Sequence, residues 1–264
     1  MPCTVRRVVA CANLIRLPQA GLESSFILRC GLLICAMRVS EVFYSIQGEG
    51  RLLGVPSVFI RTAGCNLRCV WCDTPYSSWQ PEGKNWSVTK LLGEVAKYPS
   101  RHVVVTGGEP LLAPELGALT EQLKDAGVHI TIETAATLFK PVRCDLISLS
   151  PKLANSTPWR RARGKFAALH ERRRLNLGVI QKYLDVHDYQ LKFVVEQKTD
   201  FAEIGEILAQ LRNVDPARVL IMAQGTTNRE LNRRAKWIVE RCKTYGFSYT
   251  PRLHIQLFGN RRGT

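Results

Sequence analysis

Three cysteines within eight residues are the clearest chemical signal in this sequence. Cys65, Cys69 and Cys72 follow a short β-rich segment that ends at Arg61. A structural zinc site normally has four cysteine or histidine ligands, and no histidine lies near this segment. A disulfide would pair two of the three thiols and leave the third unpaired. Thiolates are also the usual ligands of iron–sulfur clusters, and three of them leave one iron of a four-iron cluster open to another ligand. The spacing therefore favours an open cluster over structural zinc.

A second candidate site begins where the next β-rich segment ends. Gly107 and Gly108 follow a valine-rich run and lead into Glu109. Glycines at a strand end allow the backbone to approach a ligand closely, although such a pair is usually only a turn. Glu133 and the segment 150–152 end the next two predicted strands, so they belong at the same edge of a parallel sheet.

The elements that must position these residues alternate along the chain. Short β-rich runs and helical patterns follow one another from Met37 onward, which is typical of βαβ units and an α/β fold. We predict strands over 39–44, 57–61, 102–106, 128–133, 146–150, 190–195, 218–223 and 252–257, and helices over 88–98, 114–126, 166–185, 201–213 and 228–245.

Several residues mark the ends of these predicted helices. Ser87 and Asp200 are expected at N-cap positions, and Thr227 with Glu230 matches a capping box. Glycines just past two helices are expected in the left-handed conformation, namely Gly127 and Gly246.

The cysteine spacing and the Gly-Gly-Glu turn together resemble the radical S-adenosylmethionine (SAM) superfamily. The resemblance implies a partial or modified (β/α) barrel in which the three cysteines hold a [4Fe-4S] cluster. The open iron would bind SAM, and an electron from the cluster would cleave SAM to a 5′-deoxyadenosyl radical. It also implies a set of SAM-binding residues, namely Gly107, Gly108, Glu109, Ser150, Pro151 and Lys152.

The two ends of the patterned segment narrow this resemblance to one family. Segments 43–50 and 253–264, with Arg61, Thr106 and the residues after Cys72, resemble the 7-carboxy-7-deazaguanine synthases. Members convert 6-carboxy-5,6,7,8-tetrahydropterin to 7-carboxy-7-deazaguanine and ammonia, in the biosynthesis of deazapurines such as queuosine. The resemblance implies a homodimer, Mg²⁺ held by Thr74, and substrate contacts from Gln47, Gly48, Glu49, Arg61, Thr106, His254 and Thr264.

Each of these substrate residues also has a structural interpretation. Arg61 could be a salt-bridged residue at a strand end, His254 a buried core histidine, and 47–50 a plain turn. If Arg61 does bind substrate, its planar guanidinium can form two parallel hydrogen bonds with the pterin carboxylate. Two competing hypotheses remain open: another radical SAM enzyme such as a glycyl-radical activase, and a basic zinc protein that binds nucleic acid.

Composition sets limits on the remaining possibilities. The 264 residues are 45% hydrophobic, which excludes disordered and collagen-like classes. The longest apolar run, 26–37, contains Arg29 and is shorter than the roughly 20 residues of a spanning helix. Nine cysteines without a disulfide pattern indicate a reducing compartment. We therefore expect a cytoplasmic protein that is not inserted in a membrane.

Two segments depart from the family pattern. Residues 1–36 carry four arginines, one acid and four cysteines, and fit either a transit peptide or, as we favour, an extension outside the core. The catalytic domain would then be 37–264. The segment 159–174 contributes much of the +15 net charge. It is either a solvated helix face or a dock for an acidic electron donor such as flavodoxin; direct nucleic-acid binding is not expected because the family's substrate is a free pterin.

Overall fold

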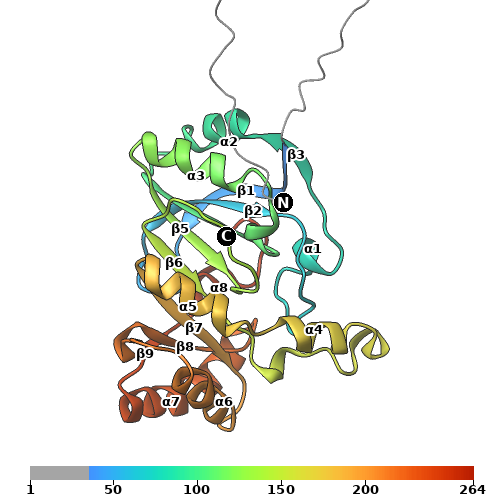
Figure 1. Ribbon diagram of the computed structural model, residues 1–264, viewed down its shortest axis with the longest axis vertical. Helices are drawn as coiled ribbons and strands as arrows, with labels where there is room; N and C mark the ends of the chain where they lie inside the picture. Colours follow the sequence, from blue (N-terminus) through green and yellow to red (C-terminus); the bar gives the residue numbers. More distant parts are fainter. Residues whose placement is uncertain (1–35) are drawn as a thin grey trace, which may run out of the picture. The chain divides into compact units, whose positions relative to one another are not determined.

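The computed structural model describes residues 36–264, which form a helix-covered sheet (Figure 1). The sheet has nine strands in the order β3-β1-β2-β4-β5-β6-β7-β8-β9. β1 pairs antiparallel with both of its neighbours, and β2, β4, β5, β6, β7, β8 and β9 are parallel. The strands are β1 Ala36–Ile46, β2 Pro56–Thr62, β3 Lys84–Ser87, β4 His102–Gly107, β5 His129–Thr134, β6 Leu146–Leu149, β7 Tyr189–Val195, β8 Val219–Ala223 and β9 Ser248–Thr250.

The helices follow the strands in the alternation that the sequence predicts. They are α1 Pro75–Ser78, α2 Val88–Val95, α3 Leu116–Asp125, α4 Ala167–Arg173, α5 Leu177–Val186, α6 Asp200–Ala209, α7 Asn228–Tyr245 and α8 Leu253–Phe258. The sheet remains open, so the predicted partial (β/α) barrel is confirmed. Within Ala36–Thr264, no helix is both long and apolar enough to cross a membrane.

Successive residues of a strand point to opposite sides of the sheet, so one face forms the core and the other lines a cavity. On β7, Leu191 and Phe193 pack into the main hydrophobic core under the helices. Lys192 and Val194, from the same strand, line a cavity on the other face. The same alternation on β2 places Ile60 in the core and its neighbours in the cavity. The cavity is therefore built from residues that the main core does not use.

The predicted helix ends are mostly correct. Ser87 accepts a hydrogen bond from the backbone of Lys90 as the N-cap of α2, and Thr227 forms the capping box with Glu230 on α7. Both predicted glycines have positive φ. Asp200 is not an N-cap, because Thr199 holds that position and the Asp200 carboxylate instead accepts hydrogen bonds from the backbone of 196 and 197 and from Asn155.

Three other predictions were wrong or incomplete. The segment predicted as a strand over 252–257 is the helix α8, and the last strand, β9, lies just before it. The helix predicted over 166–185 is divided into α4 and α5 at Asn176, whose side chain caps α5. The short elements α1 and β3 were missed because four residues carry too little periodicity to identify them.

The predicted extension lies, except for Ala36, outside the described residues. Among the described residues, the first one buried in the main hydrophobic core is Met37. We expect a chain that begins at Met37 to fold and turn over like the full chain, since it retains every described core residue. Thermal unfolding and steady-state turnover of the two proteins would check this. A truncated protein that is insoluble or inactive would show that the extension belongs to the catalytic domain.

Candidate active site

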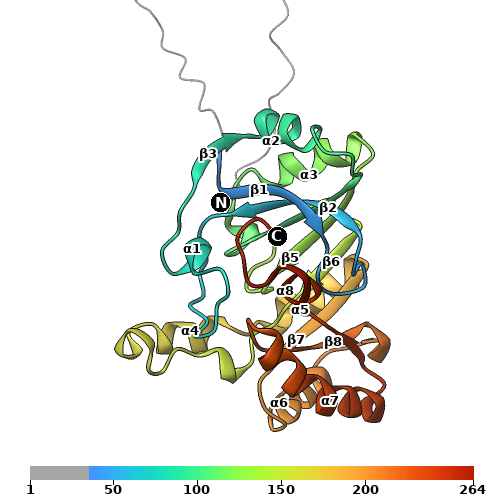
Figure 2. The ribbon, with the colours of Figure 1, turned by 180° about the vertical axis from the view of Figure 1, so that it is seen from behind.

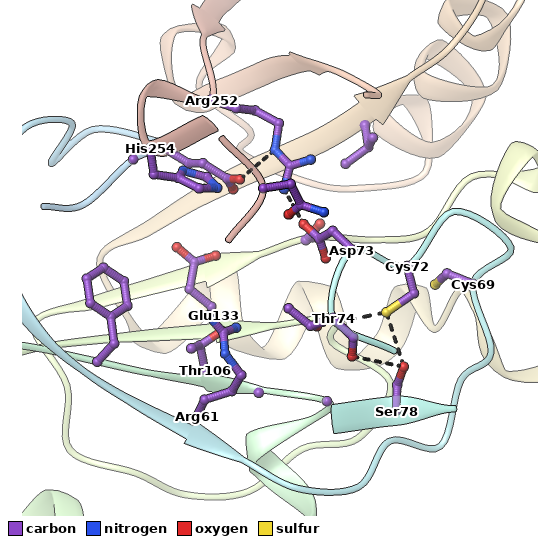
Figure 3. Close-up of a pocket in the computed structure, with 18 of the residues that line it drawn as sticks. Arg61, Cys69, Cys72, Asp73, Thr74, Ser78, Thr106, Glu133, Arg252 and His254 are labelled. Atoms are coloured by element: carbon purple, nitrogen blue, oxygen red, sulfur yellow. Dashed lines mark hydrogen bonds and ion pairs between the residues drawn. The ribbon is translucent and has the colours of Figure 1, made fainter. Parts of the chain in front are cut away.

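A cavity of about 270 Å³ lies at the carboxyl ends of the parallel strands. The three cysteines of the predicted cluster line it, on the segment between β2 and α1. Figure 3 shows two of them, Cys69 and Cys72. Cys69 is buried and the other two are partly buried. The Cys72 thiol lies 3.1 Å from the Ser78 hydroxyl. Burial raises the pKa of Cys65 and of Cys69 to about 12, and a metal bound to these thiols would favour their ionised form.

The donors present fit a cluster better than a zinc ion. Three cysteines line the cavity, and its one histidine, His254, packs against Gly48. Zinc needs its ligands around one point, whereas the cysteines of an iron–sulfur cluster bind different irons. The donor set therefore suits the predicted [4Fe-4S] cluster.

The diglycine turn at the end of β4 also fits its predicted role. Gly107 has φ of 147°, and a Cβ there would lie 2.3 Å from the Thr62 hydroxyl. A Cβ on Gly108 would lie 2.1 Å from the carbonyl oxygen of Gly64, just before the first cysteine. Only glycine allows β4 and the cysteine segment to approach this closely, so the turn forms one wall of the cavity.

The remaining predicted SAM residues divide into two groups. Ser150 and Lys152 line the cavity, and the Lys152 amine donates to the Ser150 hydroxyl over 2.7 Å. Pro151 is buried and does not line it. Glu109 is also buried outside the lining, and its carboxylate accepts hydrogen bonds from Thr134 Oγ1 and from two backbone amides. In this arrangement Glu109 fixes the neighbouring strand end, and its contact with SAM stays a prediction.

All the predicted substrate residues line the same cavity, together with Thr74. They come from the β1–β2 connection, β2, β4, α8 and the chain end, which meet over the sheet (Figure 2). Gly48 lies against His254 so closely that a Cβ would be 2.0 Å from the ring Nδ1. Arg61 donates through Nε to Glu41 over 2.6 Å. It is thus both salt-bridged, as its structural interpretation requires, and part of the cavity wall.

A chain of alternating charges lines the cavity, and Figure 3 shows its end at Arg252 and Asp73. Lys192 Nζ lies 2.6 Å from Glu49 and 2.8 Å from Glu133, and it is only 4% exposed. Arg252 donates to Glu49 over 3.1 Å and also to Asp73. Each buried charge thus has an opposite partner, as burial demands.

These pairs keep the Glu49 carboxylate ionised. Burial raises the pKa of Glu49, but the Lys192 and Arg252 charges outweigh burial and hold that pKa far below its ordinary value. Burial lowers the pKa of Lys192, but Glu133 and Glu49 together raise it above its usual range. The cavity therefore presents fixed acceptors to whatever binds there.

Comparisons with known proteins agree with this geometry. The Radical SAM superfamily model matches residues 59–156, which include the cysteine segment and the diglycine turn. A 7-carboxy-7-deazaguanine synthase of Rhodopirellula baltica is 46% identical over 230 residues, covering 87% of this chain and 89% of that protein. One from Halobacterium salinarum is 42% identical, covering 85% and 91%. This chain belongs to the 7-carboxy-7-deazaguanine synthase family.

A solved structure supports the same assignment. The crystal structure of QueE from Escherichia coli superimposes with a TM-score of 0.63 and 25% identity, covering 83% of this chain and 95% of that one. The predicted superfamily, the fold class, the cluster and SAM are confirmed. The chain is an enzyme of the radical SAM type, and a zinc protein that binds nucleic acid is excluded.

Three residues of the cavity floor were missed from the sequence as parts of a substrate site: Lys192, Arg252 and Asp73. Glu133 was considered, but only for SAM. Lys192 carried a usable signal, since it lies in the middle of a strand whose seven residues are all buried. A lysine in such a place must have acidic partners.

Proposed function

We propose that this chain is a radical SAM lyase that converts 6-carboxy-5,6,7,8-tetrahydropterin to 7-carboxy-7-deazaguanine and ammonia, in deazapurine biosynthesis. One observation carries the proposal. The segments at the two ends of the catalytic domain, which resemble the family most specifically, line one cavity with the three thiols. A generic radical SAM enzyme has no need of Gln47, Glu49 or His254 in that place.

The groups that the cavity would hold divide between its two sides. Cys65, Cys69 and Cys72 would hold the cluster, with SAM between it, the diglycine turn and Lys152. When bound and reduced, the cluster supplies the electron that makes SAM a source of radicals. The structure's own residues bind, orient and enclose the two small molecules.

The substrate would bind on the side away from the thiols. Its carboxylate suits the Arg61 guanidinium, which keeps both Nη atoms for it while Nε is engaged by Glu41. The ring's donor edge suits Glu49, whose carboxylate is held in place by Lys192 and Arg252. Gln47 Nε2 reaches Glu133 at 3.4 Å, so Gln47 is oriented too.

Mg²⁺ is proposed beside Thr74. The Thr74 hydroxyl faces the cavity near Cys72, and Ser77 Oγ donates to it over 3.0 Å. Asp73 precedes Thr74 in the chain, but its carboxylate is already paired with Arg252. Because a single hydroxyl cannot form a complete site, the ion would be shared with substrate and water, as is usual for Mg²⁺.

The family resemblance supports a homodimer, and the thiol content supports the cytoplasm as compartment. Among the described residues all five cysteines are free thiols, which suits reducing conditions. Light scattering of the purified protein tests the dimer.

The proposed carboxylate contact is tested by substrate selectivity. Anaerobic holoprotein should bind 6-carboxytetrahydropterin about 10 to 100 times more tightly than the analogue without the carboxylate, because a charged hydrogen bond contributes about 1.5–3 kcal/mol. Arg61→Leu should remove most of that preference. Arg51→Leu, which replaces an exposed arginine paired with Asp188, is the matched control and should retain it. Equal binding of the two pterins by the unaltered protein would place the carboxylate elsewhere.

The chain end provides a second test. Arg262 fixes the tail by donating to Glu41, Glu82 and the carbonyl of Ser40. Thr264 then lines the cavity, where residues added after it would crowd the pterin. A C-terminal tag should therefore raise the KM for the pterin by about tenfold or more, with SAM binding nearly normal. An N-terminal tag should be harmless. Equal KM values for the two tagged proteins would remove Thr264 from the site.

A further inference from the structure

The segment between β6 and α5 has an exposed surface that is positively charged. Its five exposed cations form no ion pair among those of Ala36–Thr264. The only acid between 157 and 174 is Glu171, which is paired with Arg174. Trp159 stands among the cations and is 63% exposed. We call this surface the basic face and define it by Arg160, Arg163, Lys165, Arg172 and Arg173.

The basic face is attached directly to the cysteine segment. Arg161 donates to the carbonyl of Val70 over 2.8 Å and lies 4.0 Å from the centre of the Trp79 ring. Trp79 in turn donates to the carbonyl of Cys69 over 3.0 Å. His170, on α4, accepts from the backbone of Arg68. Both ribbon views show α4 standing out from the sheet on the side of this segment (Figures 1 and 2).

We propose that the basic face docks an acidic protein that donates single electrons to the cluster. The proposal rests on the proposed function, since only a cluster at Cys65, Cys69 and Cys72 needs an electron. Electron transfer weakens steeply with distance, so the donor must dock where little protein separates it from the cluster. The contacts of Arg161 and Trp79 put the basic face at such a place.

The charge and the aromatic residue suit this kind of partner. Unpaired cations attract an acidic protein over a long range and raise its association rate. An exposed tryptophan within a charged rim is typical of the centre of a protein interface. The same features could bind a nucleic acid. The electron donor is favoured because the basic face is fastened to the cysteine segment, whereas the proposed substrate is a small molecule.

The test compares two reductants. Arg163→Glu, Arg172→Glu and Arg173→Glu are combined in one variant. The control variant combines Arg229→Glu, Arg233→Glu and Lys236→Glu, which reverses three exposed cations on α7. In both views α7 lies on the other side from α4 (Figures 1 and 2). Turnover is measured with purified reduced flavodoxin, an acidic one-electron donor, and with dithionite, which needs no docking site.

We expect the basic-face variant to lose about tenfold or more in kcat/KM for flavodoxin while its dithionite rate stays unchanged. The control variant should stay within about twofold in both assays. Raising the salt to about 300 mM should slow the unaltered protein with flavodoxin far more than the basic-face variant.

Unchanged kcat/KM for flavodoxin in the basic-face variant would overturn the proposal. Binding to tRNA is measured as the nucleic-acid probe. If the basic-face variant loses tRNA binding and nothing else, the proposal is likewise overturned. Loss in both reductant assays would mean that the substitutions damage the site, and would also contradict docking. If the unaltered protein forms no product even with dithionite, the proposed function itself fails, so the two failures are distinguishable.

Discussion

Replacing Cys65, Cys69 or Cys72 with alanine should abolish both cluster assembly and SAM cleavage. Each thiol lines the cavity wall and would supply one iron ligand. No fourth cysteine lines the cavity, and its one histidine, His254, packs against Gly48. We expect purified variants with little iron and sulfide and without the visible absorbance of the cluster. Iron and sulfide analysis after anaerobic reconstitution, with 5′-deoxyadenosine as the product of SAM cleavage, measures both effects.

The matched control is Cys144→Ala. Cys144 is a partly buried free thiol that lies 3.7 Å from His187 and outside the cavity. This variant should keep a full cluster and normal turnover. A cavity variant, such as Cys69→Ala, that retains a full cluster and activity would contradict the assignment of the thiols.

Replacing Lys192 with methionine should produce the second large effect. The substitution keeps an unbranched side chain, one atom shorter, but leaves Glu49 and Glu133 without the cation between them. Losing one partner of a buried ion pair costs about 3–5 kcal/mol, part of which should appear as lower stability and part as lower turnover. We therefore expect kcat to fall by about 100-fold, measured with saturating SAM and pterin.

The pH profile distinguishes this role from a merely structural one. Burial alone raises the pKa of Glu49, and the Lys192 charge is the largest influence that opposes it. Without the lysine that pKa rises, so the ionised carboxylate is lost at a higher pH. The acid limb of the variant's profile should move to higher pH, and activity should partly recover as the pH is raised.

Lys198→Met is the control for this substitution. Lys198 follows the same strand but is exposed and forms none of the described ion pairs. Its profile and stability should match those of the unaltered protein. If Lys192→Met lowers stability but leaves the pH profile in place, Lys192 does not set the charge of the carboxylates.

The sequence predicted the parts of the fold that depend on local patterns. Long amphipathic helices with clear caps, such as α7 with its Thr227 capping box, were found at the correct bounds. The end of the chain was mispredicted because the alternation of apolar residues in 253–258 suits a strand, whereas the backbone there turns into α8 over the cavity. That turn depends on tertiary contacts, including the buried Arg252, and leaves no local signal.

The site shows the same division. Motifs with fixed spacing, the cysteines and the diglycine turn, were visible in the sequence and meet in the cavity. The charge chain through Lys192 and Arg252 was not found, because its members lie 60 residues apart and become partners only when β7 and α8 reach the same cavity. At Glu109 the sequence motif and the structure point to different contacts. The motif predicts a contact with SAM, whereas in the structure the carboxylate accepts hydrogen bonds from three groups of the protein.

One measurement tests the central claim most directly. The protein is reconstituted anaerobically with iron and sulfide, reduced with dithionite, and incubated with SAM, Mg²⁺ and 6-carboxytetrahydropterin. We predict that mass analysis finds 7-carboxy-7-deazaguanine with release of ammonia. Cleavage of SAM without that product would contradict the account, because it would mean that this cavity generates the radical for a different substrate.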